Sequence, residues 1–303
     1  MARVAEQPLL MWRQKQSRPT PNGDTTPMPV MTTPLEPRAA LAPAARREGM
    51  VAVTIIERVS SPDGRVSRPG RVFAWLGALL FGASLAYFLF SYAITYGENQ
   101  QTTPLGTAIA WDLALFTLFA LHHSVFARER VRSLVARTVP AALERSFYVW
   151  IASLLLIAVC ALWRPVTGAA WSIAAPLGWL MYGVLGLGVW ISIRSAQAID
   201  VWELAGVRQV TNPNAQISNP NAQLEFKTTG PYGVVRHPIY LGWFLMVFGV
   251  PVMTGTRLVF AVVSCLYLLI AIPLEERTLR RTTDGRYDAY IRFVRWKLFP
   301  GIY

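Results

Sequence analysis

The feature that most constrains the fold is a series of six apolar segments separated by polar connections. They run approximately over residues 72–95, 105–126, 146–163, 171–193, 239–254 and 258–274. The first four approach the ~20 residues that a membrane-spanning helix needs, whereas the last two are shorter. Soluble domains carry about a quarter charged residues, but this chain of 303 residues has only 15%. The pattern predicts an all-α integral membrane protein with about five to six transmembrane helices.

The two short segments predict a C-terminal helical hairpin joined by Gly255-Thr256-Arg257. Pro251 and Pro273 are expected to kink or end its helices, because proline lacks a backbone donor. An arginine-rich stretch follows the last apolar segment. We expect that stretch to form a cytoplasmic amphipathic helix.

The regions outside the apolar segments suggest the domain organisation. Residues 1–70 are rich in Pro, Thr, Ala and Arg and lack sustained periodicity, so a disordered tail is expected. Met50 is a second possible start of translation. Residues 71–195 are predicted to hold the N-terminal transmembrane helices, and residues 196–303 the C-terminal region that carries the motifs described below.

The net charge of +12 would also suit a nucleic-acid-binding protein, but the arginines lie beside the apolar segments. We therefore interpret them as determinants of membrane orientation and lipid contact, with no nucleic-acid partner. The basic residues on alternate connections are Arg68, Arg71, Arg128, Arg130, Arg132, Arg137, Arg145, Arg194, Arg208, Lys227, Arg236, Arg277, Arg280, Arg281, Arg286, Arg292, Arg295 and Lys297. The positive-inside rule then predicts a multi-pass protein of the inner or plasma membrane with both termini in the cytoplasm.

The cysteines give no sign of a metal site or a disulfide framework. Cys160 and Cys265 each lie inside an apolar segment, and no cysteine pairs with a histidine at metal-ligand spacing. We expect neither a bound metal nor a disulfide.

Residues 229–243 join a polar connection to the fifth apolar segment, and they concentrate chemically versatile side chains. Gly230-Pro231 marks a turn, and His237-Pro238 opens the apolar run. Proline suits a first helical turn, whose free N–H groups and dipole favour a carboxylate or phosphate. The alternative is an interface belt, in which the aromatic and basic residues only anchor a helix end.

Two further motifs follow the sixth apolar segment, namely Glu275-Glu276 and Tyr287-Asp288-Ala289-Tyr290. Together with residues 230–242, they resemble the paired motifs G-x-Y-x-x-x-R-H-P-x-Y-x-G, E-E-x-x-L and Y-x-x-Y of the isoprenylcysteine carboxyl methyltransferase family. The alternative for Glu275-Glu276 is a solvated acidic helix segment. The resemblance implies an S-adenosylmethionine-dependent membrane methyltransferase whose active site faces the cytoplasm.

The resemblance also implies roles for individual residues. Nine residues of this chain match family positions that line or border the cofactor. They are Tyr232, Arg236, His237, Pro238, Tyr240, Gly242, Glu275, Glu276 and Tyr290. The family's cofactor-binding glutamate corresponds to Glu275. Two departures stand out: Gly285 is displaced by one position, and Ala271 replaces an arginine of the isoprenylcysteine enzymes. The second departure argues against an isoprenylcysteine carboxylate as substrate.

A narrower resemblance covers most of residues 105–300. It rests on residues 120–125, 144–146, 163–165 and 206–209, which are similar to the bacterial methanethiol S-methyltransferases and their NnrU-like relatives. This resemblance implies a small thiol as methyl acceptor, most simply methanethiol, with dimethyl sulfide as product. The alternatives are an isoprenylcysteine carboxyl or phospholipid methyltransferase of the same fold, with a lipid-soluble substrate, and a non-catalytic NnrU-like membrane protein.

Methyl transfer to a thiol also needs a group that removes the thiol proton. His122 and His123 are the predicted catalytic residues, because a general base that titrates near neutral pH suits this task. The alternative is an interfacial histidine pair bonded to lipid or backbone. Gln209, in the fourth connection, is a further predicted cofactor-binding residue. Asp112 lies inside an apolar segment and is either functional or part of a helix start.

Overall fold

The computed structural model describes residues 66–98, 103–126, 131, 134–212, 229–283 and 285–303. The predicted tail over residues 1–70 therefore lies almost wholly outside the described residues. So do residues 213–228 of the long fourth connection.

Five of the described helices are long and apolar enough to cross a membrane. They are α2 (Arg68–Ala93), α3 (Leu105–Phe126), α5 (Ala141–Leu162), α6 (Leu177–Ile199) and α11 (Gly255–Thr282). Helix α10 (Pro238–Phe248) is apolar but shorter. The predicted all-α membrane fold is thus confirmed, and α3 has the predicted bounds. Helix α6 begins later than predicted, because Trp171 lies in strand β1 (Ala169–Ser172).

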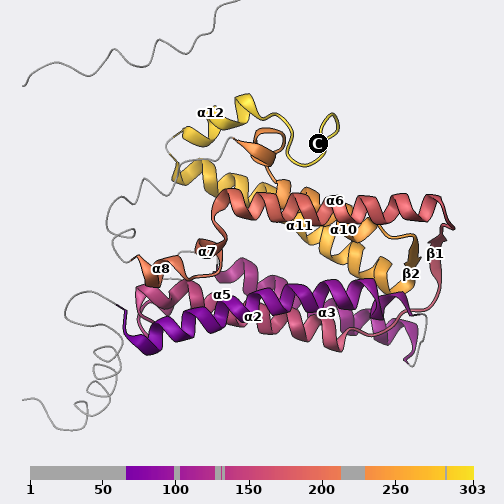
Figure 1. The fold of residues 1–303 in the computed structure, drawn as a ribbon, viewed down its shortest axis with the longest axis horizontal. Coiled ribbons are helices and arrows are strands. Elements are labelled where there is room, and N and C mark those ends of the chain that lie inside the picture. Colours follow the sequence, from indigo (N-terminus) through magenta and orange to yellow (C-terminus); the bar gives the residue numbers. More distant parts are fainter. Residues whose placement is uncertain (1–65, 99–102, 127–130, 132–133, 213–228, 284) are drawn as a thin grey trace, which may run out of the picture. The chain divides into compact units, whose positions relative to one another are not determined.

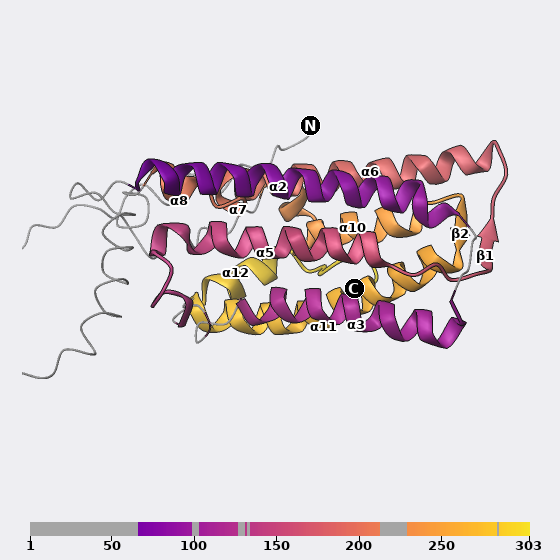
Figure 2. The same ribbon diagram turned by 90° about the horizontal axis from the view of Figure 1, so that it is seen from below.

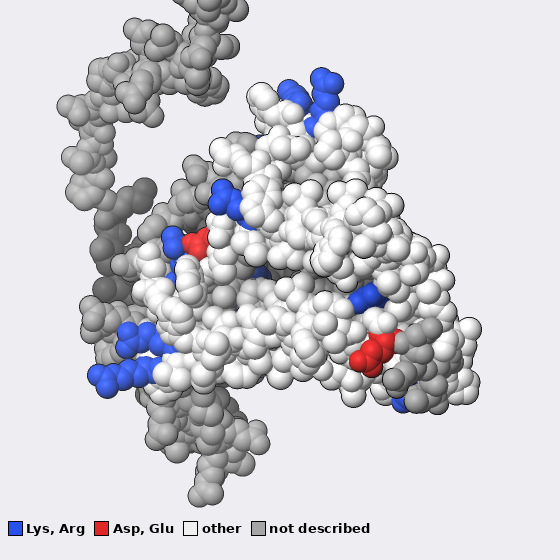
Figure 3. Space-filling view, turned by 45° about the vertical axis from the view of Figure 1, so that its right-hand side comes forward, with Lys and Arg blue, Asp and Glu red and all other residues white. Residues whose placement is uncertain are grey.

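The helices expose large apolar side chains where a soluble protein would expose charge. Leu79, Trp179 and Ile270 are all more than half exposed. On the face drawn in Figure 3, most of the surface is uncharged, and the charged residues form small separate groups. Such an outer surface is expected when hydrocarbon replaces water as the surrounding medium.

The long helices form two layers. Helices α2, α3 and α5 make one layer, and α6, α10 and α11 make the other (Figures 1 and 2). The largest cluster of buried apolar residues lies between the layers, where Phe88 of α2 stacks on Trp243 of α10 and on Phe260 of α11. Helix α3 contacts α11 across the layers. The start of α2 and helix α12 (Arg286–Phe293) lie at one end of the helices, and both strands lie at the other (Figure 1).

The fifth apolar segment is half helix and half extended chain. Helix α10 ends at Phe248, and an 11-residue helix rises only about 16 Å. Strand β2 (Val252–Thr254) completes the crossing and pairs antiparallel with β1. The carbonyl of Val247 accepts from the Tyr92 hydroxyl, and that of Val250 accepts from Trp171 Nε1 at 3.0 Å. Irregular backbone at membrane depth is tolerated here because protein groups satisfy it.

The predicted hairpin connection is wrong in detail. Gly255-Thr256-Arg257 forms the first turn of α11, and the Thr254 hydroxyl caps it by accepting from the Arg257 N–H at 3.3 Å. The chain turns earlier, over residues 249–254. Pro251 follows the end of α10 as expected, whereas α11 continues through Pro273 to Thr282.

Arg257 ties this turn to the end of α2. It is buried, and its guanidinium donates to the carbonyls of Tyr92, Ala93 and Val252 at 3.0, 2.6 and 2.7 Å. The last carbonyls of a helix have no partner within the helix, so another group must satisfy them. The arginine therefore joins the two layers at the end that carries the strands.

Replacing Arg257 with methionine should lower the thermal stability of the detergent-solubilised protein. The change leaves three carbonyls without this donor, and each unsatisfied buried group costs about 1–3 kcal/mol. Arg277→Met is the matched control, because Arg277 lies on the same helix and is exposed. Equal unfolding temperatures for the two variants would contradict the role given to Arg257.

Candidate active site

The first predicted motif lies where α10 begins. Residues Gly230–Gly233 form the short helix η3, and Gly230 has a φ of 61°, which favours glycine. His237 is the N-cap of α10, and Pro238 is its first helical residue. The prediction that His237-Pro238 opens the helix is therefore confirmed, and proline fits there because no helical donor is lost.

Arg236 and Glu276 form a buried ion pair between the start of α10 and the C-terminal part of α11. The sequence predicts that this end of α11 faces the cytoplasm. Arg236 Nε lies 2.7 Å from Glu276 Oε1, and the side chains are 5% and 8% exposed. Arg236 Nη1 also donates to the carbonyls of Val294 and Arg295, at 2.8 and 2.7 Å. A buried charge needs a partner and further hydrogen bonds, and this arginine has both.

The C-terminal segment is held against the same motif. The backbone N–H groups of Arg236 and His237 donate to the carbonyls of Trp296 and Lys297, both at 2.9 Å. The Tyr290 hydroxyl donates to the Tyr232 carbonyl at 2.8 Å. The two motifs that are separated in sequence therefore form one hydrogen-bonded unit.

The two adjacent glutamates have different surroundings. Neighbouring residues on a helix point about 100° apart, and here Glu276 is buried while the Glu275 side chain is 46% exposed. Glu275 Oε2 accepts from the Tyr240 hydroxyl at 2.9 Å and lies 3.7 Å from His237 Nδ1. His237 Nε2 lies 3.3 Å from Glu276 Oε1. Glu275 is thus the accessible carboxylate of the pair.

Aromatic groups complete this side of the site. The rings of His237 and Tyr240 stack with centroids 5.4 Å apart and an interplanar angle of 8°. Burial raises the pKa of the Tyr232 and Tyr287 hydroxyls well above the usual value, and it raises the pKa of Tyr290 to about 12. These three hydroxyls therefore stay protonated at neutral pH.

The donor set fits a small amphiphilic cation. An accessible carboxylate can hold an ammonium group or a diol, and a stacked aromatic pair can face a cation or a heterocycle. Among the described residues, no group of three or more His, Cys, Asp or Glu side chains could hold a metal ion.

Gly242 has a packing role in this structure. A Cβ at this position would lie 2.6 Å from the Gly188 carbonyl oxygen of α6 and closer still to the Ser192 hydroxyl. Only glycine allows α10 and α6 to approach this closely. Contact between the helices is enough to account for the residue.

The predicted catalytic histidines lie on α3, in the other layer. His123 Nδ1 lies 2.6 Å from the Tyr148 hydroxyl of α5. The His122 ring stacks on Tyr148, and both its nitrogens are buried without a hydrogen-bond partner. The neighbouring Ser124 hydroxyl lies 3.1 Å from the Tyr267 hydroxyl of α11.

Sequence reasoning missed Tyr148 and Tyr267. Both lie inside apolar segments, and a hydroxyl at membrane depth is a signal that could have identified them. Tyr267 interacts electrostatically with Tyr148 on one side and with Tyr240 and Glu275 on the other. It therefore lies between the histidines and the accessible glutamate.

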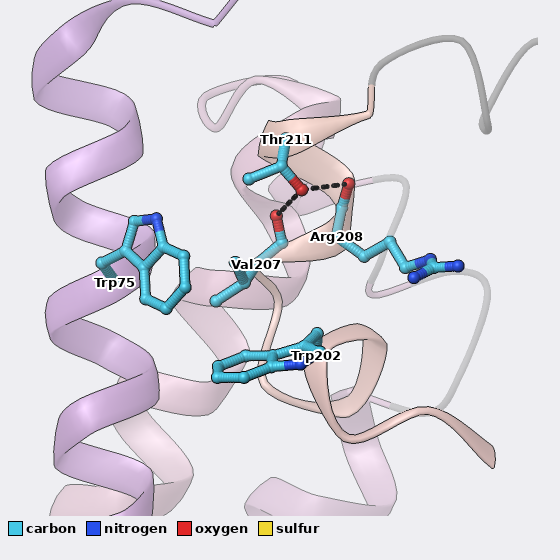
Figure 4. Close-up of a pocket in the computed structure, with 5 residues that line it drawn as sticks. All are labelled: Trp75, Trp202, Val207, Arg208 and Thr211. Carbon is cyan, nitrogen blue, oxygen red and sulfur yellow. Dashed lines mark hydrogen bonds between the residues drawn. The ribbon is translucent and has the colours of Figure 1, made fainter. Parts of the chain in front are cut away.

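Gln209 lies in α8 (Arg208–Thr211), which packs against α2 and α5. Its side-chain amide donates to the Glu203 carbonyl at 3.3 Å, and among the residues that the structure describes no hydrogen bond joins it to those around Glu275. A shallow pocket opens between α2, α7 (Val201–Leu204) and α8, lined by Trp75, Trp202, Val207, Arg208 and Thr211 (Figure 4). Exposed tryptophans beside an arginine are typical of a membrane interface.

Asp112 is structural rather than part of this site. It lies well inside α3, so the alternative role at a helix start does not apply. Its Oδ1 accepts from the Arg164 backbone N–H at 2.8 Å. This bond joins α3 to the chain that follows α5.

Comparison with known proteins gives consistent matches. A family model described as "Phospholipid methyltransferase" matches residues 178–282. The chain is 35% identical over 230 residues to "Methanethiol S-methyltransferase" of Crocosphaera subtropica, covering 71% of this chain and 89% of the relative. It is 36% identical over 235 residues to "Methanethiol S-methyltransferase 2" of Bradyrhizobium diazoefficiens, covering 74% and 90%. "Nurim" of Xenopus laevis is 29% identical over 60% of this chain and 66% of that protein. No solved structure gave a significant match.

Truncating Glu276 should destabilise the protein far more than truncating Glu275. Glu276→Ala leaves the Arg236 charge buried and unpaired, which costs about 3–5 kcal/mol. Glu275→Ala removes an exposed carboxylate, for which changes within about 0.5 kcal/mol are usual. Thermal unfolding of both variants in one detergent measures the difference. The assignment fails if the two variants unfold at the same temperature.

Proposed function

The chain is a membrane methyltransferase that belongs to the methanethiol S-methyltransferase family, and on this basis we propose that it transfers a methyl group from S-adenosylmethionine to a small thiol. Methanethiol is the proposed acceptor, and dimethyl sulfide is the product. The observation that carries the proposal is the accessible carboxylate of Glu275, held beside the stacked His237–Tyr240 pair by a buried ion pair.

We assign cofactor binding to residues 196–303. When bound, S-adenosylmethionine supplies a methyl group activated by a positively charged sulfur. Glu275 would hold the amino group or the ribose diol, because it is the exposed carboxylate of the site. Tyr232, Tyr240 and His237 would provide the aromatic surroundings. Arg236, Glu276 and Tyr290 would keep this arrangement rigid rather than touch the cofactor.

The thiol has to be oriented, shielded from water and deprotonated. One of the two adjacent histidines, His122 and His123, is the proposed base. They lie across the layers from Glu275, and Tyr267 is between them. A site that spans both layers would bring a lipid-soluble thiol towards a cofactor that enters from the aqueous side.

A second candidate is methyl transfer to a phospholipid, which the family model over residues 178–282 favours. An isoprenylcysteine carboxylate is less well supported, because Ala271 stands where those enzymes have an arginine. A non-catalytic role as an NnrU-like membrane protein is the third candidate.

Purified membranes supplied with methyl-labelled S-adenosylmethionine and methanethiol should release labelled dimethyl sulfide into the headspace. The lipid fraction should stay unlabelled. Label in the lipid fraction alone would favour the second candidate, and label in neither fraction would favour the non-catalytic one.

Glu275→Gln should weaken S-adenosylmethionine binding about 10- to 100-fold, since a hydrogen bond to a charged group contributes about 1.5–3 kcal/mol. The unfolding temperature should not change, because the side chain is half exposed. Calorimetric titration of the purified variant measures the affinity. Binding as tight as in the wild type, with the fold intact, would rule out the assigned cofactor site.

We also propose that the site faces the cytoplasm. The start of α2 and the end of α11 lie at the same end of the helices (Figure 1), and basic residues gather on the adjoining connections. A reporter that is active only in the cytoplasm should therefore give a signal when it is fused after Tyr303, and one that is active only in the periplasm should not. A signal from the periplasmic reporter would contradict the proposed orientation.

A further inference from the structure

The two histidines of α3 are adjacent in sequence but differ in their surroundings. Both ring nitrogens of His122 are buried, and its ring lies flat against Tyr148, with an interplanar angle of 14°. His123 is exposed. Its Nδ1 meets the Tyr148 hydroxyl at 2.6 Å, and no partner is described for its Nε2. Only His123 therefore combines a fixed ring with an accessible nitrogen.

His123 belongs to the same group of polar side chains as Glu275. Tyr148, which holds His123, interacts electrostatically with Tyr267. Tyr267 interacts in turn with Tyr240 and Glu275. These hydroxyls come from α5, α11 and α10, and the Tyr267 hydroxyl lies 3.1 Å from that of Ser124, next to His123. Polar groups at membrane depth are costly unless other groups compensate them.

The hydrogen bond to Tyr148 determines what the imidazole can do. A neutral imidazole carries one proton, so a free lone pair on Nε2 requires the proton on Nδ1. The Tyr148 oxygen can accept that Nδ1–H. Once Nε2 has also taken a proton, both nitrogens are donors, and Nδ1 still needs an acceptor. A hydroxyl oxygen satisfies this need in both states.

Resting on the proposed function, we propose that His123 is the catalytic residue that accepts the thiol proton, and that Tyr148 is the positioning residue that keeps Nε2 available. In this step the S–H bond breaks, the sulfur keeps the electron pair, and an N–H bond forms at Nε2. The proton then passes to water. His122 has no part in the proton transfer.

Among the residues that the structure describes, the titratable and charged groups that face His123 come from three helices. They are Arg145 and Tyr148 of α5, His122 of α3, and Tyr267 of α11, which reaches His123 through Tyr148. Tyr148→Phe removes only the hydroxyl and preserves the aromatic ring. His122→Phe keeps a ring against Tyr148 and is the matched control.

The test compares the pH dependence of methanethiol methylation in His123→Gln, Tyr148→Phe and His122→Phe. At neutral pH, His123→Gln should lose about 100- to 10,000-fold in kcat, the usual contribution of a general base. Tyr148→Phe should lose about tenfold to a hundredfold, because it removes one hydrogen bond to a charged ring. Both losses should shrink as the pH rises towards the pKa of the thiol. Both should also shrink for a more acidic thiol such as 2,2,2-trifluoroethanethiol, which ionises in water more readily than methanethiol and depends less on the enzyme's base.

His122→Phe should keep the wild-type pH profile, and all three variants should bind S-adenosylmethionine with wild-type affinity by calorimetry. The proposal is overturned if His123→Gln or Tyr148→Phe keeps the wild-type profile. It is also overturned if the loss is equal at every pH and for both thiols. If wild-type protein methylates no thiol at all, the proposed function itself fails, which is a separate outcome.

Discussion

The buried ion pair between Arg236 and Glu276 is the interaction on which the candidate site depends. Two charges in an apolar environment must be fully compensated, since an unpaired partner would be very costly. Arg236 meets this demand with Glu276 and with two carbonyls of the C-terminal segment. Because the Glu276 side chain points into the protein to pair with Arg236, helical geometry turns Glu275 outward and leaves its carboxylate accessible. The same pair therefore stabilises the site and creates its binding group.

A second constraint acts at the opposite end of the helices. Helix α10 is too short to cross the membrane, so extended chain completes the passage and needs partners for its backbone. Arg257, Trp171 and Tyr92 supply them. The arrangement returns α11 to the level at which α10 began, and this return brings Glu275 beside His237. Because α10 ends before it has crossed the membrane, the chain needs stabilising hydrogen bonds at one end of the helices, and the candidate site forms at the other end.

The proposed reaction uses both layers. The layer of α10 and α11 carries the residues proposed to bind the cofactor, and the layer of α3 and α5 carries the proposed base. Tyr267 of α11 lies between them and contacts Ser124 across the layers. A protein that methylates a small apolar thiol has to admit it from the membrane while excluding water from the transferred methyl group. The proposed site takes its residues from both layers of apolar helices and would serve both requirements.

The sequence alone determined the number and approximate bounds of the apolar segments, the opening of α10 at His237-Pro238, and the residue types of the candidate site. These follow from local properties: hydrophobic length, the conformation of proline and the spacing of motifs. Tertiary structure alone decided which glutamate is buried, which histidine is held by Tyr148, and where the fifth segment stops being helical. Those outcomes depend on partners supplied by distant segments, such as Val294, Tyr148 and Trp171. No local pattern encodes them, because burial and hydrogen bonding are settled only when the layers pack together.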